Sequence, residues 1–281
     1  MIQLLNKELW EEKDILKEML NDPFYYGHLG KYALSSSAAK KLIESPKSYA
    51  KSLRSSSDSQ ALRDGRLVHL SVLEEHRLND LVIVGGTKGG KAFKSAVEEH
   101  GKDMVYTESE LNNANWIAKA VKECNEAWHL LDGCSFEKPA IKMIDGLAFR
   151  AKADAMKGKT IIDLKTTSGV PSGGLAKFKW TAKNFSYDLQ AALYLHLFDA
   201  DEFIFLVIDK DSKDIGIFEC SQDFLDRGKE KVRQAIDVYK HFFINTDPMD
   251  SVRNYVLKDI LCDHSPSCLV ACHLYCHSSR Q

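Results

Sequence analysis

Two aspartates and a lysine near the middle of the chain have the types and spacing of a catalytic group. Asp163 and Lys165 are two residues apart in a run of strand-forming residues, so on a strand their side chains point to one face of a sheet. Asp154 lies in a preceding predicted strand. If residues 157 and 158 form the turn, Asp154 faces Ile161 and lies diagonally across from Asp163, about 7 to 8 Å away at the backbone. Two carboxylates at that separation can share one cation.

The chemistry open to such a group is the hydrolysis of a phosphate ester. Carboxylate oxygens are hard ligands that suit Mg²⁺ or Mn²⁺ together with water and phosphate. A cation held by Asp154 and Asp163 would polarise the phosphate and lower the pKa of a bound water, while the Lys165 ammonium would offset charge on the phosphate. An Asp-x-Lys tripeptide also fits ordinary ion pairs on a solvated strand, so the surrounding elements must decide.

Three predicted strands carry these residues. Alternating apolar residues indicate strands over 140–144, 147–156 and 160–165. The turn between the first two is Asp145-Gly146. One face of the hairpin is apolar and is expected to cover a core, with Leu147, Phe149, Ala151, Ala153, Ile162 and Leu164. The other face carries the acids together with Arg150 and Lys152, and is expected to be charged.

Helices and two more strands surround this hairpin in the prediction. Helices are indicated over 1–22, from the serine run at 35–37 to about residue 44, and over 59–75, 91–100, 108–131, 187–198 and 222–243, and strands are indicated over 203–209 and 215–220. Ser36 or Ser37 is the expected N-cap of the second helix, which should end before Pro46. This order of elements predicts an α/β fold in which helices flank a mixed central sheet.

Several motifs together resemble those of one nuclease superfamily. Asp154 followed by Asp163-Leu164-Lys165-Thr166-Thr167 resembles the Asp…(Asp/Glu)-x-Lys core of the PD-(D/E)xK nucleases. Gly65-Arg66-Leu67-Val68-His69 resembles the G-x-x-x-H motif of RecB-like nucleases, and Gln190-Ala191-Ala192-Leu193-Tyr194 resembles their Q-x-x-x-Y motif. The chain is most similar to the RecE-type, exodeoxyribonuclease VIII-like phage recombination exonucleases, which it also resembles around Ser35-Ser36-Ser37 and Ser45-Pro46. The resemblance covers about residues 24–240.

The resemblance implies a fold, a site and an activity. The fold would be α/β, with a restriction-endonuclease-like core. His69 would join Asp154 and Asp163 as a metal ligand, and Gln190 and Tyr194 would support the catalytic lysine or the DNA backbone. The implied reaction is Mg²⁺-dependent digestion of double-stranded DNA from an end, in the 5′ to 3′ direction. It would leave single-stranded tails for a single-strand annealing or recombination protein, and the enzyme would be a ring-like homo-oligomer.

Two other functions fit the same motifs. One is a structure-specific or iron-sulfur RecB-like nuclease, which would differ in its iron content and in cutting circular DNA. The other is a non-catalytic DNA-binding protein that keeps the scaffold. The intact acids Asp154 and Asp163, with Lys165, favour an enzyme over the second alternative.

Seven residues outside the motif core are predicted to contact DNA: Ser36, Ser37, Lys40, Arg150, Lys152, Lys177 and Lys179. The serines begin a helix whose amides can meet a phosphate, although a simple helix cap explains them equally well. Phe178 and Trp180 alternate with the last two lysines, so charge and stacking could combine there, and a solvated loop would have the same composition. Glu137 is a candidate for a further acid of the site, but it matches no clear motif and a surface pair with Lys138 would explain it, so it is left outside the predicted site.

The whole-chain composition excludes some classes of protein. The 281 residues are 44% hydrophobic and carry a net charge of −2, so a polyanion would have to be held by local basic residues. The sequence has no run of about 18 apolar residues and no signal-peptide pattern. We therefore expect a cytoplasmic protein (in the host cytoplasm if phage-encoded) that has no membrane partner.

The cysteines and the chain ends complete the predicted organisation. Cys124, Cys134 and Cys220 are scattered, which is typical of reduced thiols. Four more cysteines lie near the end, at positions 262, 268, 272 and 276, with a spacing that matches neither an iron-sulfur pattern nor a C-x-x-C knuckle. The expected divisions are an N-terminal helix over 1–24, a nuclease domain over 25–245, and a tail of uncertain order over 246–281.

Overall fold

The computed structural model describes residues 1–281 except 55–58, 169–172, 245–247, 254 and 257–281. The four cysteines near the chain end therefore lie outside the described residues, and their predicted lack of a metal site stays a prediction. Among the described residues, no helix combines the length and the apolar character needed to cross a membrane.

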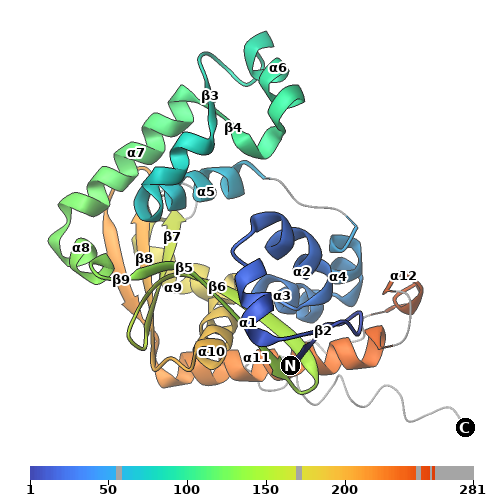
Figure 1. The fold of residues 1–281 in the computed structure, drawn as a ribbon. Coiled ribbons are helices and arrows are strands. Elements are labelled where there is room, and N and C mark those ends of the chain that lie inside the picture. Colours follow the sequence, from blue (N-terminus) through green and yellow to red (C-terminus); the bar gives the residue numbers. More distant parts are fainter. Residues whose placement is uncertain (55–58, 169–172, 245–247, 254, 257–281) are drawn as a thin grey trace, which may run out of the picture.

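A five-stranded mixed sheet forms the centre of the protein (Figure 1). Its strands, in spatial order, are β5 (Ser135–Ile144), β6 (Leu147–Lys157), β7 (Thr160–Thr167), β8 (Glu202–Asp209) and β9 (Ile215–Glu219). All neighbours are antiparallel except β7 and β8, which are parallel and are joined by a helical crossover. The expected mixed sheet with flanking helices is confirmed.

Helices cover both faces of this sheet (Figure 1). One face packs against α3 (Ser36–Glu44), α4 (Pro46–Ser52), α9 (Phe178–Asn184), α10 (Tyr187–Phe198) and α11 (Gln222–Phe243). The other face, around β7 and β8, packs against α5 (Gln60–Leu73), α7 (Glu108–Glu123) and α8 (Asn125–Leu131). The last two correspond to the single helix expected over 108–131, which is interrupted at Cys124.

A smaller group of elements projects from one end of the molecule (Figure 1). It contains a two-stranded parallel sheet, β3 (Val82–Val84) with β4 (Val105–Thr107), and the helix α6 (Lys91–His100). Short helical turns occur at η2 (Glu75–Asp80), η3 (Lys102–Met104), η4 (Leu175–Lys177) and α12 (Pro248–Ser251). η4 packs against the sheet through Leu175, whereas Asp80, Met104 and Tyr106 from the projecting part and its connections line the groove described below.

The N-terminal segment is not the long helix expected over 1–22. It contains β1 (Ile2–Gln3), β2 (Leu9–Trp10), α1 (Glu12–Glu18), the π-helix η1 (Pro23–His28) and α2 (Leu29–Tyr32). Lys7 has a φ of +72°, which a helix cannot accommodate, and the chain reverses there into a short hairpin. The apolar residues of this segment pack on Ile141 and Ala148, so it covers the hairpin face that was expected to be charged and open.

The hairpin register differs from the expected one by two residues. Lys157 pairs with Thr160, so the turn lies at Gly158 and Lys159, where Gly158 has a φ of +58°. The same register, continued, places Asp154 opposite Asp163 instead of opposite Ile161. The recorded pairing ends at Ala155 with Ile162, and the two acids contact helices of different layers, Asp154 by His69 on α5 and Asp163 by Gln190 on α10.

Candidate metal and catalytic site

The β6–β7 ladder ends where the acids begin. Its last pair is Ala155 with Ile162, and beyond it the Asp154 carboxylate accepts a hydrogen bond from the Leu164 amide at 2.8 Å. His69, on α5, donates from Nε2 to the Leu164 carbonyl at 2.9 Å. The backbone of Leu164 therefore fixes one side chain from the sheet and one from a helix at the same place.

This arrangement decides which nitrogen of His69 is free for a ligand. A carbonyl oxygen can only accept a hydrogen bond, so Nε2 must carry the proton and the neutral ring presents the lone pair of Nδ1. Nδ1 lies 3.5 Å from Oδ2 of Asp154. Metal-binding histidines generally donate their second ring N–H to a carbonyl or carboxylate in this way. His69 thus has the orientation of a metal ligand.

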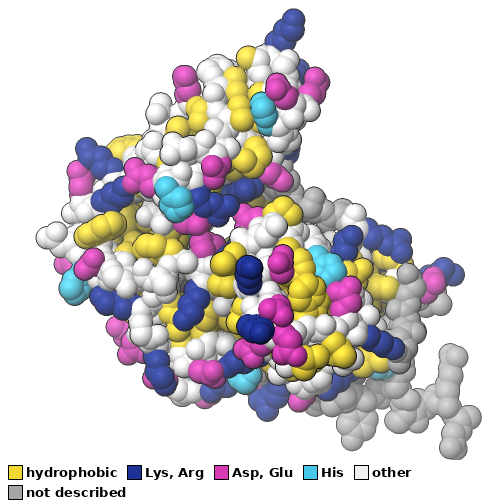
Figure 2. Space-filling model, in the orientation of Figure 1, with side chains coloured by type: hydrophobic (Ala, Val, Ile, Leu, Met, Phe, Trp, Pro, Cys, Tyr) yellow, Lys and Arg dark blue, Asp and Glu magenta, His cyan; other side chains and the backbone are white. Residues whose placement is uncertain are grey.

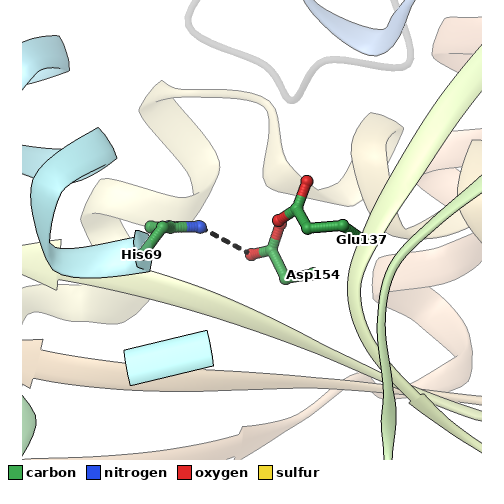
Figure 3. Close-up of side chains that lie close together, drawn as sticks. All are labelled: His69, Glu137 and Asp154. Atoms are coloured by element: carbon green, nitrogen blue, oxygen red, sulfur yellow. Dashed lines mark ion pairs between the residues drawn. The ribbon is translucent and has the colours of Figure 1, made fainter. Parts of the chain in front are cut away.

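Glu137 completes a group of three potential ligands (Figure 3). One ligand atom of His69, one of Glu137 and one of Asp154 lie within 4.8 Å of one another. The register explains the proximity, because Phe136 pairs with Ala155 and Lys138 with Ala153, which leaves Glu137 beside Asp154. Glu137 has a φ of +49°, a conformation that is costly for a residue with a side chain and that is often found at functional sites.

The charges at Glu137 favour the binding of a cation. Burial raises the pKa of Glu137 to about 8, and the negative charges of Asp154 and Glu74 act in the same direction against the opposing effect of Lys152. A carboxyl held among other carboxylates in this way is stabilised as an anion by a positive ion. One imidazole nitrogen and two carboxylates form a donor set that fits a divalent cation such as Mn²⁺ or Mg²⁺.

Asp163 and Lys165 form a second, deeper group next to the first. Asp163 is 2% exposed, and its carboxylate lies 2.5 Å from Lys165 Nζ and accepts a hydrogen bond from Gln190 Nε2 at 2.6 Å. Burial raises the pKa of Asp163 to about 6, with Lys165 opposing and Asp154 adding to the shift. Burial also disfavours the charged form of Lys165, but the charges of Asp163 and Asp154 outweigh this and raise its pKa. Lys165 therefore remains a cation.

The helix α10 contributes both residues of the Q-x-x-x-Y motif to this region. Gln190 and Tyr194 are one helical turn apart and share a face of α10. Burial raises the pKa of Tyr194 well above its usual value, while a hydrogen bond with Gln190 opposes the shift. Gln190 thus connects the tyrosine to Asp163, which is the supporting position that the resemblance implied.

The structure brings most of the predicted site residues together, but in two groups. His69 and Asp154 lie with Glu137, whereas Asp163 is not one of the three clustered ligands and is bonded to Lys165 and Gln190. The role of Asp163 as a direct metal ligand stays a prediction.

Arg150 and Lys152 line the groove that also reaches His69 and Asp154, although they are more buried than the hairpin pattern suggested, and their contact with DNA stays a prediction. They are 7% and 8% exposed. Arg150 donates to the Leu29 carbonyl at 3.1 Å and lies over the Tyr25 ring, and Lys152 pairs with Asp22 at 3.0 Å. Both cations hold the N-terminal segment against the sheet because that segment covers the face on which they lie.

The serines before α3 are near the site, although the cap is one residue earlier than expected. Ser35 is the N-cap and accepts a hydrogen bond from the Ala38 amide at 3.2 Å, so neither Ser36 nor Ser37 caps the helix. Ser36 and Ser37 line the same groove as His69 and Asp154. Lys40 is not among the groove residues, and its ammonium lies 4.7 Å from the centre of the Phe185 ring.

The basic residues before and within α9 lie outside this groove. Lys177 and Lys179 are exposed and are not among its lining residues. Phe178, expected to alternate with them as a stacking residue, is 2% exposed and belongs to the core, so the expected interleaving is reduced to Trp180, which is 66% exposed.

A groove of about 1050 Å³ gives access to the metal group. One wall is α5, the other is the π-helix η1, and Glu137 and Asp154 lie between them. Figure 2 shows the surface hollowed between the projecting part and the rest of the molecule, with acidic and basic side chains around the hollow. A phosphate backbone that enters the groove would meet Glu137 and Asp154, whereas Asp163 and Lys165 lie behind them and are not among the lining residues.

Glu137 is the candidate ligand that sequence reasoning left outside the site. Its expected surface pair with Lys138 is not the arrangement observed, since the Glu137 carboxylate lies 4.0 Å from Lys152 and is largely buried. The cue was available in the Asp145-Gly146 turn. Counting back from the pair of Ile144 with Leu147 places Glu137 directly opposite Asp154.

One solved structure shares this fold. A presumed exonuclease from Eubacterium rectale, with a solved structure, is 16% identical and superimposes with a TM-score of 0.58 over 86% of this chain and 95% of its own. A phage-related exonuclease from Haemophilus somnus 129PT is 16% identical, with a TM-score of 0.33 over 76% of this chain and 96% of its own. None of the curated proteins matches the chain.

A family model matches residues 35–251, which is most of the chain and includes Glu137, Asp154 and Asp163. The family is described as a PDDEXK-like domain of unknown function (DUF3799). The superfamily that the motifs resembled is thereby confirmed, as is the nuclease-like α/β fold. This chain belongs to the PDDEXK-like family DUF3799.

Proposed function

We propose that this protein is a divalent-metal-dependent DNA exonuclease. The observation that carries the proposal is the convergence of His69, Glu137 and Asp154 beside the buried group of Asp163, Lys165 and Gln190. A structural ion-pair network would not need a histidine whose Nδ1 lone pair is directed at two crowded carboxylates. Membership of the PDDEXK-like family and the exonuclease names of the structural neighbours support the same reaction class.

Different residues of the site would bind the metal, stabilise charge and position the lysine during phosphodiester hydrolysis. His69, Glu137 and Asp154 would hold Mg²⁺ or Mn²⁺, which supplies a Lewis acid for the phosphate and a water of lowered pKa. Lys165 stays protonated and presents a positive charge next to this group, where it stabilises the negative charge that develops on the phosphate. Asp163 fixes the position of Lys165, and Gln190 fixes Asp163. The Lys165 ammonium therefore does not have to be reoriented during the reaction.

The finer features of the proposal come from the resemblance to RecE-type exonucleases. They are action on double-stranded DNA from an end in the 5′ to 3′ direction, the production of single-stranded tails for an annealing protein, and assembly as a homo-oligomer. The groove that leads to the acids supports the entry of a nucleic-acid strand. The direction of digestion and the partner depend on the resemblance alone.

The test is digestion of end-labelled linear duplex DNA and of closed circular duplex DNA, each with Mg²⁺ or with a chelator. We expect the wild-type protein to degrade only linear DNA and only with the metal. Labels at the 5′ and at the 3′ end report the direction. Asp154→Asn should abolish the activity, whereas Asp201→Asn, an exposed aspartate in a surface ion pair with Lys159, should not.

Each alternative has its own outcome in this experiment. Cleavage of the circular DNA, together with iron in the purified protein, would favour a structure-specific or iron-sulfur nuclease. DNA binding without cleavage under all metal conditions would indicate a non-catalytic scaffold. Full activity of Asp154→Asn would refute the assignment of the site.

A further inference from the structure

The wall of the groove that faces α5 carries an aromatic ring with no role in the site described above. Tyr26 lies on the π-helix η1, lines the groove, and is 64% exposed. Single exposed aromatic residues are common on protein surfaces. Tyr26 differs from the others because it lies in the same groove as Glu137 and Asp154.

The orientation of Tyr26 is fixed by its neighbours. Its ring packs edge to face on Tyr25, with centroids 4.9 Å apart and an interplanar angle of 86°. Tyr25 is itself buried beneath the Arg150 guanidinium, and the Lys152 ammonium lies 5.4 Å from the Tyr26 centroid. The ring is therefore held by a buried layer while much of its surface stays accessible. An aromatic ring that is both fixed and accessible loses little conformational entropy when it binds a flat ligand.

The opposite wall offers the complementary group for a nucleotide. Arg66, on α5 one turn before His69, lines the groove, and its guanidinium makes a long hydrogen bond of 3.4 Å to the Asp103 carbonyl. A guanidinium presents five donors and suits the oxygens of a phosphate. The groove thus places a stacking surface on one side, a phosphate-binding group on the other, and the acids between them.

We propose that Tyr26 stacks on the base of a nucleotide next to the scissile phosphate, and that the strand being cut is single-stranded at the site. A base inside a duplex has both faces covered by its neighbours and a terminal base keeps only one face free, so a base beside an internal scissile phosphate can stack on Tyr26 once its strand has left the helix. Arg66 would contact the phosphate of the same strand. The proposal rests on the proposed nuclease function, because it takes the acids in the groove as the place where the strand is cut.

The experiment combines variants of Tyr26 with DNA that lacks single bases. The probe is a fluorescently labelled single-stranded DNA of 12 nucleotides, and a set of copies each carries one abasic position. Binding is measured by anisotropy with Ca²⁺ in place of Mg²⁺, and cleavage is measured separately with Mg²⁺. The variants are Tyr26→Ala and Tyr26→Phe, with Trp128→Ala as a matched control, since Trp128 is also exposed but does not line the groove.

The expected pattern is specific to stacking. Removal of one base should weaken binding to the wild-type protein by about 5- to 150-fold, the range typical of one base stacked on an aromatic residue. Tyr26→Ala should weaken binding of intact DNA by a similar factor. Binding by this variant should not depend on whether that position is abasic. Tyr26→Phe, which keeps the ring, and Trp128→Ala should both behave like the wild type.

Two results would overturn the inference while leaving the nuclease function intact. One is a Tyr26→Ala variant that cleaves and binds every probe as the wild type does. The other is a Tyr26→Phe variant as weak as Tyr26→Ala, which would assign the effect to the hydroxyl. A wild-type protein that cleaves no DNA with Mg²⁺ would instead refute the proposed function. Thermal unfolding of each variant serves as the control for folding.

Discussion

Replacing Glu137 by glutamine should change stability in opposite directions with and without metal. Ligand atoms of Glu137 and Asp154 lie within 4.8 Å of each other. At an effective dielectric constant of about 20, two full charges at that distance repel by about 3.5 kcal/mol. Lys152 at 4.0 Å and protonation of Glu137 relieve part of this repulsion, so the net effect is smaller. We expect metal-free Glu137→Gln to gain about 1 to 3 kcal/mol in free energy of unfolding, which raises Tm by about 2 to 4 °C per kcal/mol.

With metal present, the same substitution should be unfavourable. Loss of a residue that merely orients a metal ligand typically weakens binding about 10- to 100-fold, so loss of a charged ligand should weaken it at least tenfold. A tenfold higher dissociation constant removes about 1.4 kcal/mol of metal-induced stabilisation at a fixed, saturating metal concentration. The variant should therefore begin with a higher Tm than the wild type and rise less as Mn²⁺ is added.

The assay is thermal unfolding during a Mn²⁺ titration, with isothermal titration calorimetry as a measure of affinity that does not depend on activity. Glu74→Gln is the matched control. Glu74 lines the same groove and is paired with Arg77 at 3.0 Å, but it is not one of the three clustered ligands. The reasoning fails if Glu137→Gln binds Mn²⁺ as tightly as the wild type, or if its metal-free Tm falls.

Three further predictions concern the supporting structure. Gly228→Ala should destabilise the protein by about 3 kcal/mol or more in chemical denaturation, because a Cβ there would overlap the Asp188 carbonyl on α10. Gly65 is also in a helix but has open space around it, so Gly65→Ala should be neutral or stabilising by up to about 1 kcal/mol. Equal effects of the two substitutions would contradict the packing argument. Lys165→Met should lower the free energy of unfolding by about 3 kcal/mol because it leaves Asp163 buried without its cation, and adding Asp163→Asn should restore part of that loss in a double-mutant cycle. At Glu110, burial is outweighed by hydrogen bonds from Lys88 and the Thr107 amide, which lower its pKa to about 2. The contribution of Glu110 to the free energy of unfolding should be present above about pH 4.5 and be lost as the pH falls towards 2. Over that interval the free energy of unfolding of the wild type should fall by about 1 to 3 kcal/mol more than that of Glu110→Gln. Parallel pH profiles of the two proteins would contradict this prediction.

Local patterns in the sequence determined the elements that carry the site. The two strands that carry Asp154 and Asp163, the helix over 187–198 and the helix over 222–243 were predicted at or near their observed bounds. The strand before them was expected from residue 140 but begins at Ser135, so the part that contains Glu137 was missed. The helix over 222–243 has strong periodicity because one side of it packs against the core, whereas the two strands and the helix over 187–198 are apolar or buried at most positions and are marked by their composition and flanking turns. Spacing within one element was sufficient to place Asp163 with Lys165, and Gln190 with Tyr194, on shared faces.

Contacts between distant segments were decided by the tertiary structure. The prediction of one helix over 1–22 was wrong because the apolar residues of this segment lie in a short hairpin and a short helix that pack on Ile141 and Ala148. That packing buried Arg150 and Lys152, which the hairpin pattern alone had left open to substrate. Periodicity records which residues of a segment are apolar, and it carries no information about which segment will cover them.

The metal group shows both contributions at one place. The types of His69 and Asp154 and their motifs were readable from the chain, and the Asp145-Gly146 turn already fixed the register that places Glu137 opposite Asp154. The sequence did not reveal that the Leu164 backbone would hold His69 and Asp154 together, or that Asp163 would turn to Lys165 and Gln190. Residue types are local properties, whereas the direction of a side chain depends on hydrogen-bond partners that only the folded chain brings within reach.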